Sequence, residues 1–301
     1  MNKCIMRESE RREADEEMEH MRKKNIIIAA ILAAVCLVLW LPVIMMVTHS
    51  LMGEGELKDA YGAVLNGQSG GIFPRLLPVY PTLRPLVKLL LDSPDFFVMF
   101  WNSVKQTGAV LIGQVLVGMP AAWAFARYQF RGRRFLFVLY MILMVMPFQV
   151  TMVSSYLVLS RLNLMDTHLS VILPGVFSTF PVFIMQKFFH SIPESLIEAA
   201  RVDGAGTFGV FRYVGVPLGI PGVMSSLILN FLEYWNAIEA PMTFLKTKSR
   251  QPLSLYLPQI TTDQMGSSFV ASLIMMTPAL LVFLWGRDYL EKGIAASGLK
   301  E

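Results

Sequence analysis

Gly204, Gly206 and Gly209 spell the pattern G-x-G-x-x-G, which cradles a pyrophosphate in dinucleotide-binding proteins. That chemistry requires a strand before the glycines and an acidic residue about 20 residues after them. Here the preceding residues 198–203 have a helical pattern, and the next acidic residue is Glu233, inside or beside an apolar run. The glycines therefore predict a turn, and nucleotide binding is not expected at them.

Other enzyme signatures are absent from the sequence. No Gly-Lys dipeptide occurs, so there is no P-loop, and the four histidines are followed by Met, Ser, Leu and Ser, so there is no H-E-x-x-H metal motif. Cys4 and Cys36 lie in a charged segment and in an apolar run, which predicts neither a disulfide nor a metal site. We expect no catalytic residue, no metal and no cofactor on this chain. With a net charge of +4 and no basic patch interleaved with aromatics, nucleic acid is not an expected partner.

The composition points to a membrane protein. Hydrophobic residues make up 54% of the 301, and 16% are charged, against about 25% in ordinary soluble domains. A membrane-spanning helix needs roughly 20 apolar residues. Six runs without Asp, Glu, Lys, Arg or His approach that length: 25–47, 106–126, 135–160, 169–186, 214–232 and 269–286. They are too long and too uniform for barrel strands. The sequence predicts an all-α, polytopic helical membrane bundle with six transmembrane helices.

The distribution of Lys and Arg orients the bundle. Segments 1–24, 127–134, 187–213 and 287–301 hold 17 of these residues, and the remaining segments hold 9. Because basic residues concentrate in cytoplasmic loops, both termini are expected in the cytoplasm, with the chain in the plasma membrane. The predicted parts are a charged cytoplasmic tail (1–24), a six-span transmembrane domain (25–286) and a cytoplasmic C-terminal tail (287–301).

Between the first two spans, residues 49–95 form the longest external segment, with a loop at 67–74 and a short interfacial helix at 86–91. The first 24 residues hold seven acidic and seven basic side chains, which is too acidic for a secretory leader. We expect the first span to be a retained anchor.

The predicted spans are poor in ionisable groups and rich in proline. A carrier driven by protons or sodium usually buries carboxylates or histidines in its spans. Their absence here indicates that energy for any transport comes from another polypeptide. Eight prolines, among them Pro147 and Pro174, lie inside the runs and predict kinked or broken helices.

Residues 191–213 contain the most informative polar pattern. Ser191 and Glu194 have the spacing of a capping box, which predicts a helix start, and Gly204 supplies a left-handed exit from that helix. A second short turn over residues 207–213 leads back to the membrane. The segment is expected to form a helix-turn-helix bracket on the cytoplasmic face, with small residues that another protein can approach closely.

This segment resembles the EAA loop of ATP-binding-cassette importer permeases, E-A-A-x-x-D-G-A followed after five residues by F-x-x-I-x-L-P. The matching residues are Glu198, Ala199, Ala200, Asp203, Gly204, Ala205, Phe211 and Pro217. Val214 and Val216 stand in place of Ile and Leu. In that family the loop docks into a groove of the ATPase subunit, so the resemblance implies a coupling loop.

The resemblance extends over the last two thirds of the chain. Residues 234–241, 251–253 and 290–300 are similar to the carbohydrate-uptake branch, and to its maltose-type second permease. It implies partners for this chain: a second permease, two ATPase subunits that carry ATP and Mg, and an extracellular solute-binding protein.

A sugar path needs side chains that hydrogen-bond and stack. The candidates are Gln149, Ser154, Ser155, Tyr156, Asn230, Tyr234 and Asn236. Polar contacts between packed helices explain the same residues. Permeases for amino acids, peptides or phosphate share the EAA loop and remain the main alternative. A membrane scaffold or signalling role for the charged N-terminus is a more remote one.

Overall fold

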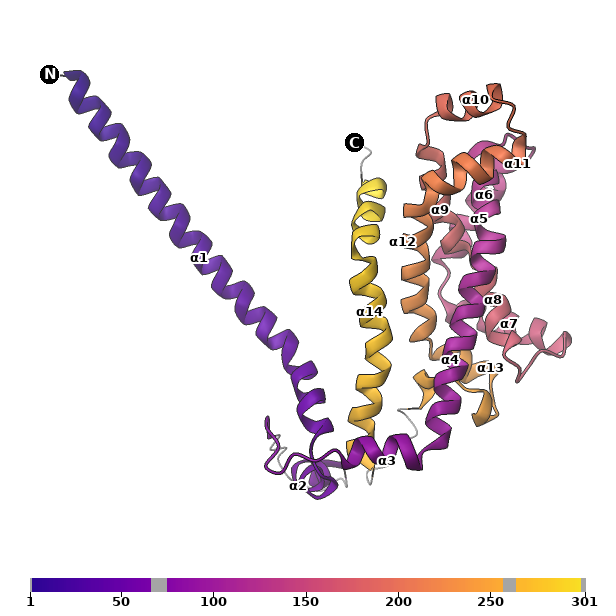
Figure 1. Ribbon diagram of the computed structural model, residues 1–301, viewed down its shortest axis with the longest axis horizontal. Helices are drawn as coiled ribbons and strands as arrows, with labels where there is room; N and C mark the ends of the chain where they lie inside the picture. The colour runs from indigo at the N-terminus through magenta and orange to yellow at the C-terminus, as the bar shows by residue number, and fades with distance from the viewer. Residues whose placement is uncertain (1, 66–74, 257–263, 299–301) are drawn as a thin grey trace. The chain divides into compact units, whose positions relative to one another are not determined.

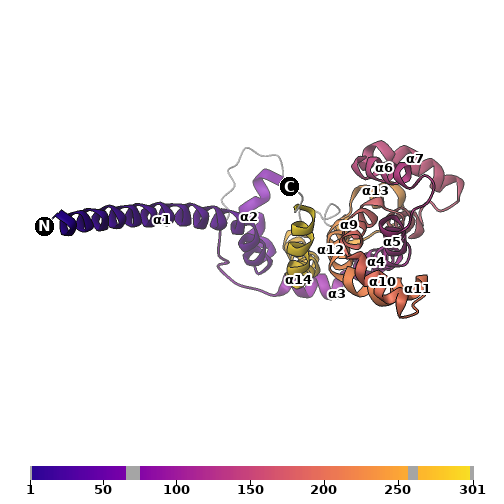
Figure 2. The same ribbon diagram turned by 90° about the horizontal axis from the view of Figure 1, so that it is seen from above.

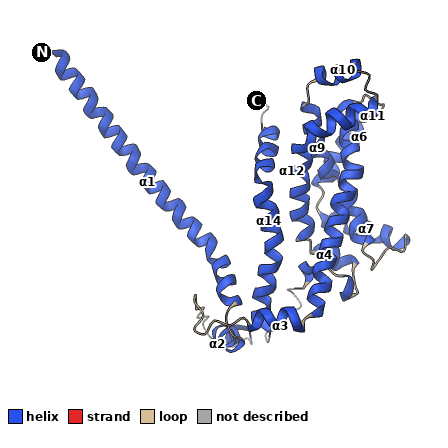
Figure 3. Cartoon of the chain, viewed as in Figure 1, coloured by secondary structure: helices blue, strands red, loops and turns tan. Residues whose placement is uncertain are grey.

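The computed structural model describes residues 2–65, 75–256 and 264–298, and for residues 2–20, 63–65 and 292–298 it describes the backbone alone. Every regular element in these ranges is helical (Figure 3). This confirms the predicted all-α class. The chain divides into two compact units, Met1–Pro85 and Leu86–Glu301.

The first unit contains α1 (Asn2–Ser50) and α2 (Glu54–Leu65). Within α1, residues Met21–Ser50 are long and apolar enough to cross a membrane. At its end the buried His49 ring is hydrogen-bonded through Nδ1 to the Met45 carbonyl at 2.6 Å and through Nε2 to the Tyr61 hydroxyl at 2.8 Å. The bond to Tyr61 joins α1 to α2. The loop predicted at 67–74 lies outside the described residues.

The second unit is a helical bundle (Figures 1 and 2). Its long helices are α4 (Pro94–Gly113), the π-helical η1 (Gln114–Gly118) and α5 (Met119–Arg127), which form one 34-residue span, with α12 (Val216–Trp235) and α14 (Met265–Gly298) beside them. The shorter elements are α3 (Arg84–Asp92), α13 (Glu239–Phe244) and two 3-10 turns, Lys248–Arg250 and Leu253–Leu255. α3 confirms the short helix expected at 86–91.

Two predicted spans are not single helices. The expected span 135–160 is wrong as one helix, because α6 (Arg133–Val145) and α7 (Phe148–Arg161) meet at an angle of 106°. Pro147 has no N–H to continue the helix and pushes Met146 into an extended conformation (ψ 121°). The expected span 169–186 is confirmed, because Leu169–Ser191 is one candidate membrane span, although a short break at residues 177–178 separates α8 (Leu169–Val176) from α9 (Thr179–Ser191).

Length and composition give the described residues five candidate spans, and the bent α6–α7 pair makes a sixth if it is counted as one.

Glycines allow α12 to pack closely against α9, and allow the residue before α12 to approach the Trp123 ring of α5. A Cβ added to Gly219 would lie 2.2 Å from Cε1 of Phe189, and one added to Gly215 would lie 2.6 Å from the Trp123 ring. Membrane helices associate through small residues because lipid provides no hydrophobic drive between them. We call Gly215 and Gly219 the glycine seam. It holds the bracket end of α12 close to Trp123 of α5 and Phe189 of α9.

Candidate functional site

The segment 191–213 forms a bracket at one end of the second unit (Figure 1). Its first arm is α10 (Glu194–Val202), and its second arm is α11 (Thr207–Val210) with the π-helical η2 (Phe211–Gly215). The second arm differs from the separate short turn that the sequence predicts. It runs directly into α12, and residues Thr207–Trp235 form one continuous span.

The bend between the arms is a Schellman motif. The Gly204 amide donates to the Arg201 carbonyl at 3.1 Å, and the Ala205 amide donates to the Ala200 carbonyl at 2.9 Å. Gly204 has φ +87°, which confirms its left-handed exit, and a Cβ there would meet nothing within 4 Å. Glycine is therefore required at this position by backbone conformation, and not by lack of space.

The predicted capping box is wrong. Ser191 ends α9, and its hydroxyl donates to the Phe188 carbonyl at 2.8 Å. Ile192 and Pro193 are extended, so α10 begins at Glu194 without a side-chain cap. The physical reason is Pro193, because a proline disfavours the helical conformation at the residue before it, so Ile192 is extended and Ser191 cannot cap α10.

Arg127, the last residue of α5, holds the bracket to the bundle. Its Nη1 donates to Oε2 of Glu194 at 3.0 Å, and its Nη2 donates to the Ile192 carbonyl. The side chain is only 11% exposed, and the guanidinium lies over the Trp123 ring, 5.8 Å from its centroid. Charge-assisted bonds of this kind are stronger than neutral ones, and here they join the end of α5 to the start of α10.

The bracket has a buried face and an exposed face. Ile197 and Val210 are 2% and 3% exposed and pack with Trp123 in one apolar core cluster. On the other face Val202 is 87% exposed and Phe208 is 74% exposed. The outer face of the bracket therefore exposes two large apolar side chains, while its inner face is seated in the core cluster.

The motif residues divide between these faces. Glu198, Ala199, Asp203 and Gly204 are exposed, as is Pro217 in the first turn of α12. Three others, Ala200, Ala205 and Phe211, are partly buried against the core cluster. Phe211 lies 5.6 Å from the Trp123 ring, centroid to centroid. The motif thus combines an accessible set of residues with the set that seats it.

The seven residues proposed for a sugar path come from two elements. Gln149, Ser154, Ser155 and Tyr156 are on α7, whereas Asn230 and Tyr234 are on α12 and Asn236 is its C-cap. Gln149 donates from Nε2 to Oε1 of Glu239 on α13 at 2.6 Å.

The α12 residues have different environments. Asn230 is fully buried, with its Oδ1 3.2 Å from Nε2 of Gln114. Tyr234 packs against Gly175, and Asn236 is exposed and bonds to its own helix. The structure thus brings Gln149 next to Glu239 and places Asn230 inside the helix packing.

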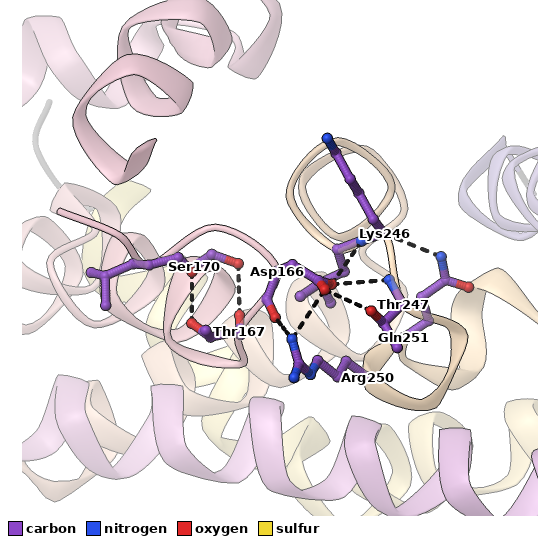
Figure 4. A network of polar contacts seen from close by, with 9 residues as sticks. Asp166, Thr167, Ser170, Lys246, Thr247, Arg250 and Gln251 are labelled. Atoms are coloured by element: carbon purple, nitrogen blue, oxygen red, sulfur yellow. Dashed lines mark hydrogen bonds and ion pairs between the residues drawn. The ribbon is translucent and has the colours of Figure 1, made fainter. Parts of the chain in front are cut away.

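Sequence reasoning missed a polar latch at the opposite end of the unit (Figure 4). Asp166 in the α7–α8 loop accepts bonds from the amides of Lys246 and Thr247, both at 2.9 Å, and from the Thr247 hydroxyl at 2.6 Å. Arg250 adds an ion pair at 3.0 Å. The Thr247 bonds, foremost that of its hydroxyl, lower the pKa of Asp166 to about 2. Asp166 also has φ +55°, an uncommon conformation outside glycine.

Polar residues of α4 hold the same loop from another side. The Asn102 amide donates to the carbonyls of Ser249 at 2.8 Å and Gln251 at 3.0 Å, and Gln106 donates to Arg250 at 3.0 Å. The sequence does contain an indication of this contact. Asn102 and Gln106 are four residues apart, so both polar side chains lie on one face of the helix. Together with Asp166 they fix the loop 246–251.

A helical membrane bundle with an exposed bracket at one end has the architecture of a transport permease. The chain belongs to the family of binding-protein-dependent transport system inner membrane components, which it matches over residues 114–296.

Named relatives and a solved structure agree with this assignment. The chain is 26% identical to the arabinooligosaccharides transport system permease protein AraQ of Halalkalibacterium halodurans, over 73% of this chain and 80% of that protein. It is also 26% identical to the diacetylchitobiose uptake system permease protein DasC of Streptomyces coelicolor, over 71% of this chain and 79% of that protein. A bacterial ABC transporter that imports alginate has the same fold, with a TM-score of 0.74 and 20% identity, over 89% of this chain and 96% of that one.

Proposed function

We propose that this chain is one permease subunit of an ATP-driven, binding-protein-dependent importer in the plasma membrane. Its six spans are the five candidate spans, of which Leu169–Ser191 comprises α8 and α9, and the bent α6–α7 pair, with both termini in the cytoplasm. The compact basic turn 127–134 supports this orientation, because it places four arginines at the bracket end of the second unit. The bracket is then cytoplasmic, and the loop 246–251 is external.

The observation that carries the proposal is the bracket itself. Its inner face is buried and anchored by Arg127, while Val202 and Phe208 project outward. We infer that an ATPase subunit covers this outer face, in the way the EAA resemblance implies. Movement of that ATPase would displace α10, and Arg127 and the continuous second arm would pass the displacement to α5 and α12.

The partners follow from the same proposal. A second permease completes the pore, two ATPase subunits hold ATP and Mg, and an extracellular solute-binding protein delivers the solute. The family description, binding-protein-dependent transport, supports the last of these. We propose that this chain binds no cofactor and catalyses no covalent step.

We propose a sugar or oligosaccharide as the transported solute. The names of the relatives support this class, since one transports arabinooligosaccharides and another takes up diacetylchitobiose. On this chain the accessible Gln149–Glu239 pair offers both a hydrogen-bond donor and an acceptor to sugar hydroxyls. Asn230 serves packing in this conformation, because its amide is buried among Gln114 and the Ser226 carbonyl.

A cross-linking experiment tests the assignment. A single cysteine replaces Phe208 on the exposed face of the bracket, and a control cysteine replaces the exposed Leu162 in the α7–α8 loop. After Cys4 and Cys36 are changed to Ser, the assembled transporter is treated with a short bifunctional reagent. The Phe208→Cys variant should form an adduct with the ATPase subunit, and the Leu162→Cys variant should not. Equal adducts at both positions, or none at Phe208, would overturn the docking role.

A further inference from the structure

A groove separate from the bracket opens beside the turn between α5 and α6. It has a volume of about 860 Å³ and is lined by Phe125, Phe137, Val138, Met141 and Gln186, with Arg133 and Arg134 at its edge. No acidic residue lines it. The groove therefore combines an apolar floor with a strongly basic rim.

The basic rim has no internal counter-charge. Neither Arg133 nor Arg134 forms an ion pair within the described part of the chain, and the sole side-chain hydrogen bond of Arg133 there is a long one of 3.5 Å to the Ala126 carbonyl. Both guanidiniums line the groove without a carboxylate partner, and their planar donors suit phosphate oxygens. The rim is thus complementary to a phosphate group.

A polar side chain, Gln186, also lines the groove. Gln186 of α9 is 8% exposed, and its side chain makes no hydrogen bond among the described residues. The amide atoms of Gln186 are not among the buried polar atoms that lack a partner, so they stay accessible and offer a donor and an acceptor to a polar group of the occupant. An ester carbonyl a few ångströms below a phosphate would satisfy it.

The remaining wall is apolar and continuous with the outside of the bundle. α6 contains no fully buried residue, and Phe135, Val138 and Ile142 are exposed along it. In a bilayer such a surface faces acyl chains. An occupant must therefore be anionic at one end and apolar along its length.

We propose that this groove binds an anionic phospholipid, with the phosphate between Arg133 and Arg134, the glycerol ester against Gln186, and an acyl chain along Phe137 and Met141. The proposal rests on the membrane placement given above, and it is independent of the transported solute. A lipid in this position contacts Phe125 of the core cluster that also seats the bracket. It would therefore stabilise the α5–α6 corner from which Arg127 anchors α10.

The test measures lipid binding by the full-length chain in its assembled transporter. The complex in neutral detergent is titrated with phosphatidylglycerol, with phosphatidylcholine and with inorganic phosphate, and bound molecules are counted by native mass spectrometry. Each basic residue near a lipid headgroup contributes about fivefold in affinity. Arg134→Gln should therefore weaken phosphatidylglycerol binding about fivefold. The matched control is Arg131→Gln in the same turn, outside the groove lining, and it should change binding less than twofold.

A second variant separates a built site from general surface charge. Gln186→Leu leaves every arginine in place and should weaken phosphatidylglycerol binding, with no change in the amount of assembled transporter. Equal losses for Arg131→Gln and Arg134→Gln, equal binding of phosphatidylcholine, or equal binding of inorganic phosphate would each overturn the proposal. So would a cysteine at Val138 that cross-links to the partner permease, because a protein would then occupy the groove.

Discussion

The guanidinium of Arg127 and the carboxylate of Glu194 lie 3.0 Å apart although 67 residues separate them in the chain. The contact joins the end of a membrane-spanning helix to the start of the bracket. Arg201 lies 4.0 Å from the same carboxylate but is exposed. The Glu194 carboxylate therefore has one buried partner and one solvated partner. This allows the contributions of the two ion pairs to stability to be compared.

Replacing Arg127 by Met should destabilise the protein by about 1–3 kcal/mol, because the Ile192 carbonyl and Glu194 both lose their partner. ATP-coupled uptake should fall with it. Replacing Arg201 by Met should cost less than about 0.5 kcal/mol, since exposed pairs contribute little. Thermal unfolding of both purified variants, with uptake in proteoliposomes, measures the difference. Equal losses of stability in the two variants would show that Arg127 does not anchor the bracket.

Gly204→Leu should leave the protein in the membrane and abolish ATP-coupled uptake. At φ +87° an L-residue is strained by about 1–2 kcal/mol, and relief of that strain would reorient the bend. Gly204→Asn should retain most uptake, because Asn tolerates the left-handed conformation and the site has room for its side chain. Uptake assays on matched membrane amounts compare the two. Normal transport by the Leu variant would contradict the coupling role.

Much of this bend could be predicted from the sequence, because the signals are local. Gly204 after a helical run is sufficient to predict the left-handed exit, and apolar runs are sufficient to predict helices. The break at Pro147 was harder to predict, since the other prolines inside the runs, such as Pro221, lie within continuous helices. Whether a proline bends or divides a helix depends on neighbouring helices, which one sequence does not reveal.

Gly219→Ala should destabilise the bundle by about 1–3 kcal/mol, because the added Cβ would lie 2.2 Å from the Phe189 ring. The combined change with Phe189→Leu should recover part of the loss by removing the opposing ring atoms. Gly108→Ala is the control, since a Cβ there meets nothing within 4 Å. Unfolding midpoints in one detergent provide the measurement. A loss from Gly108→Ala as large as that from Gly219→Ala would argue against the glycine seam.

The Asp166 latch should persist from neutral pH to about pH 4 and open as the pH falls toward 2. Its folded pKa of about 2 lies below the ordinary value, so the stabilisation is complete above that ordinary value and is lost on protonation. Hydrogen exchange of the Lys246 and Thr247 amides, corrected for intrinsic rates, reports the latch. Asp166→Asn should speed their exchange at pH 7, whereas Asp203→Asn should not. Loss of protection already near pH 6 would refute the assignment.

The latch and the anchor could not be predicted because both are tertiary. Asp166 is 80 residues from Lys246, and nothing in the flanking sequence indicates that pairing. Arg127 was interpreted only as a marker of the cytoplasmic side, which any Arg in that turn would have been. Sequence patterns indicate the bracket, whereas the bonds that hold it join residues far apart in the chain.

The 34-residue helix from Pro94 to Arg127 grips a different loop at each end. Near its start Asn102 holds the carbonyls of Ser249 and Gln251, and at its end Arg127 holds that of Ile192. A tilt of this helix about its π-helical midsection therefore carries the two loops in opposite directions, as the arms of a lever move about a fulcrum. A single probe on either loop would therefore report how far the whole subunit moves.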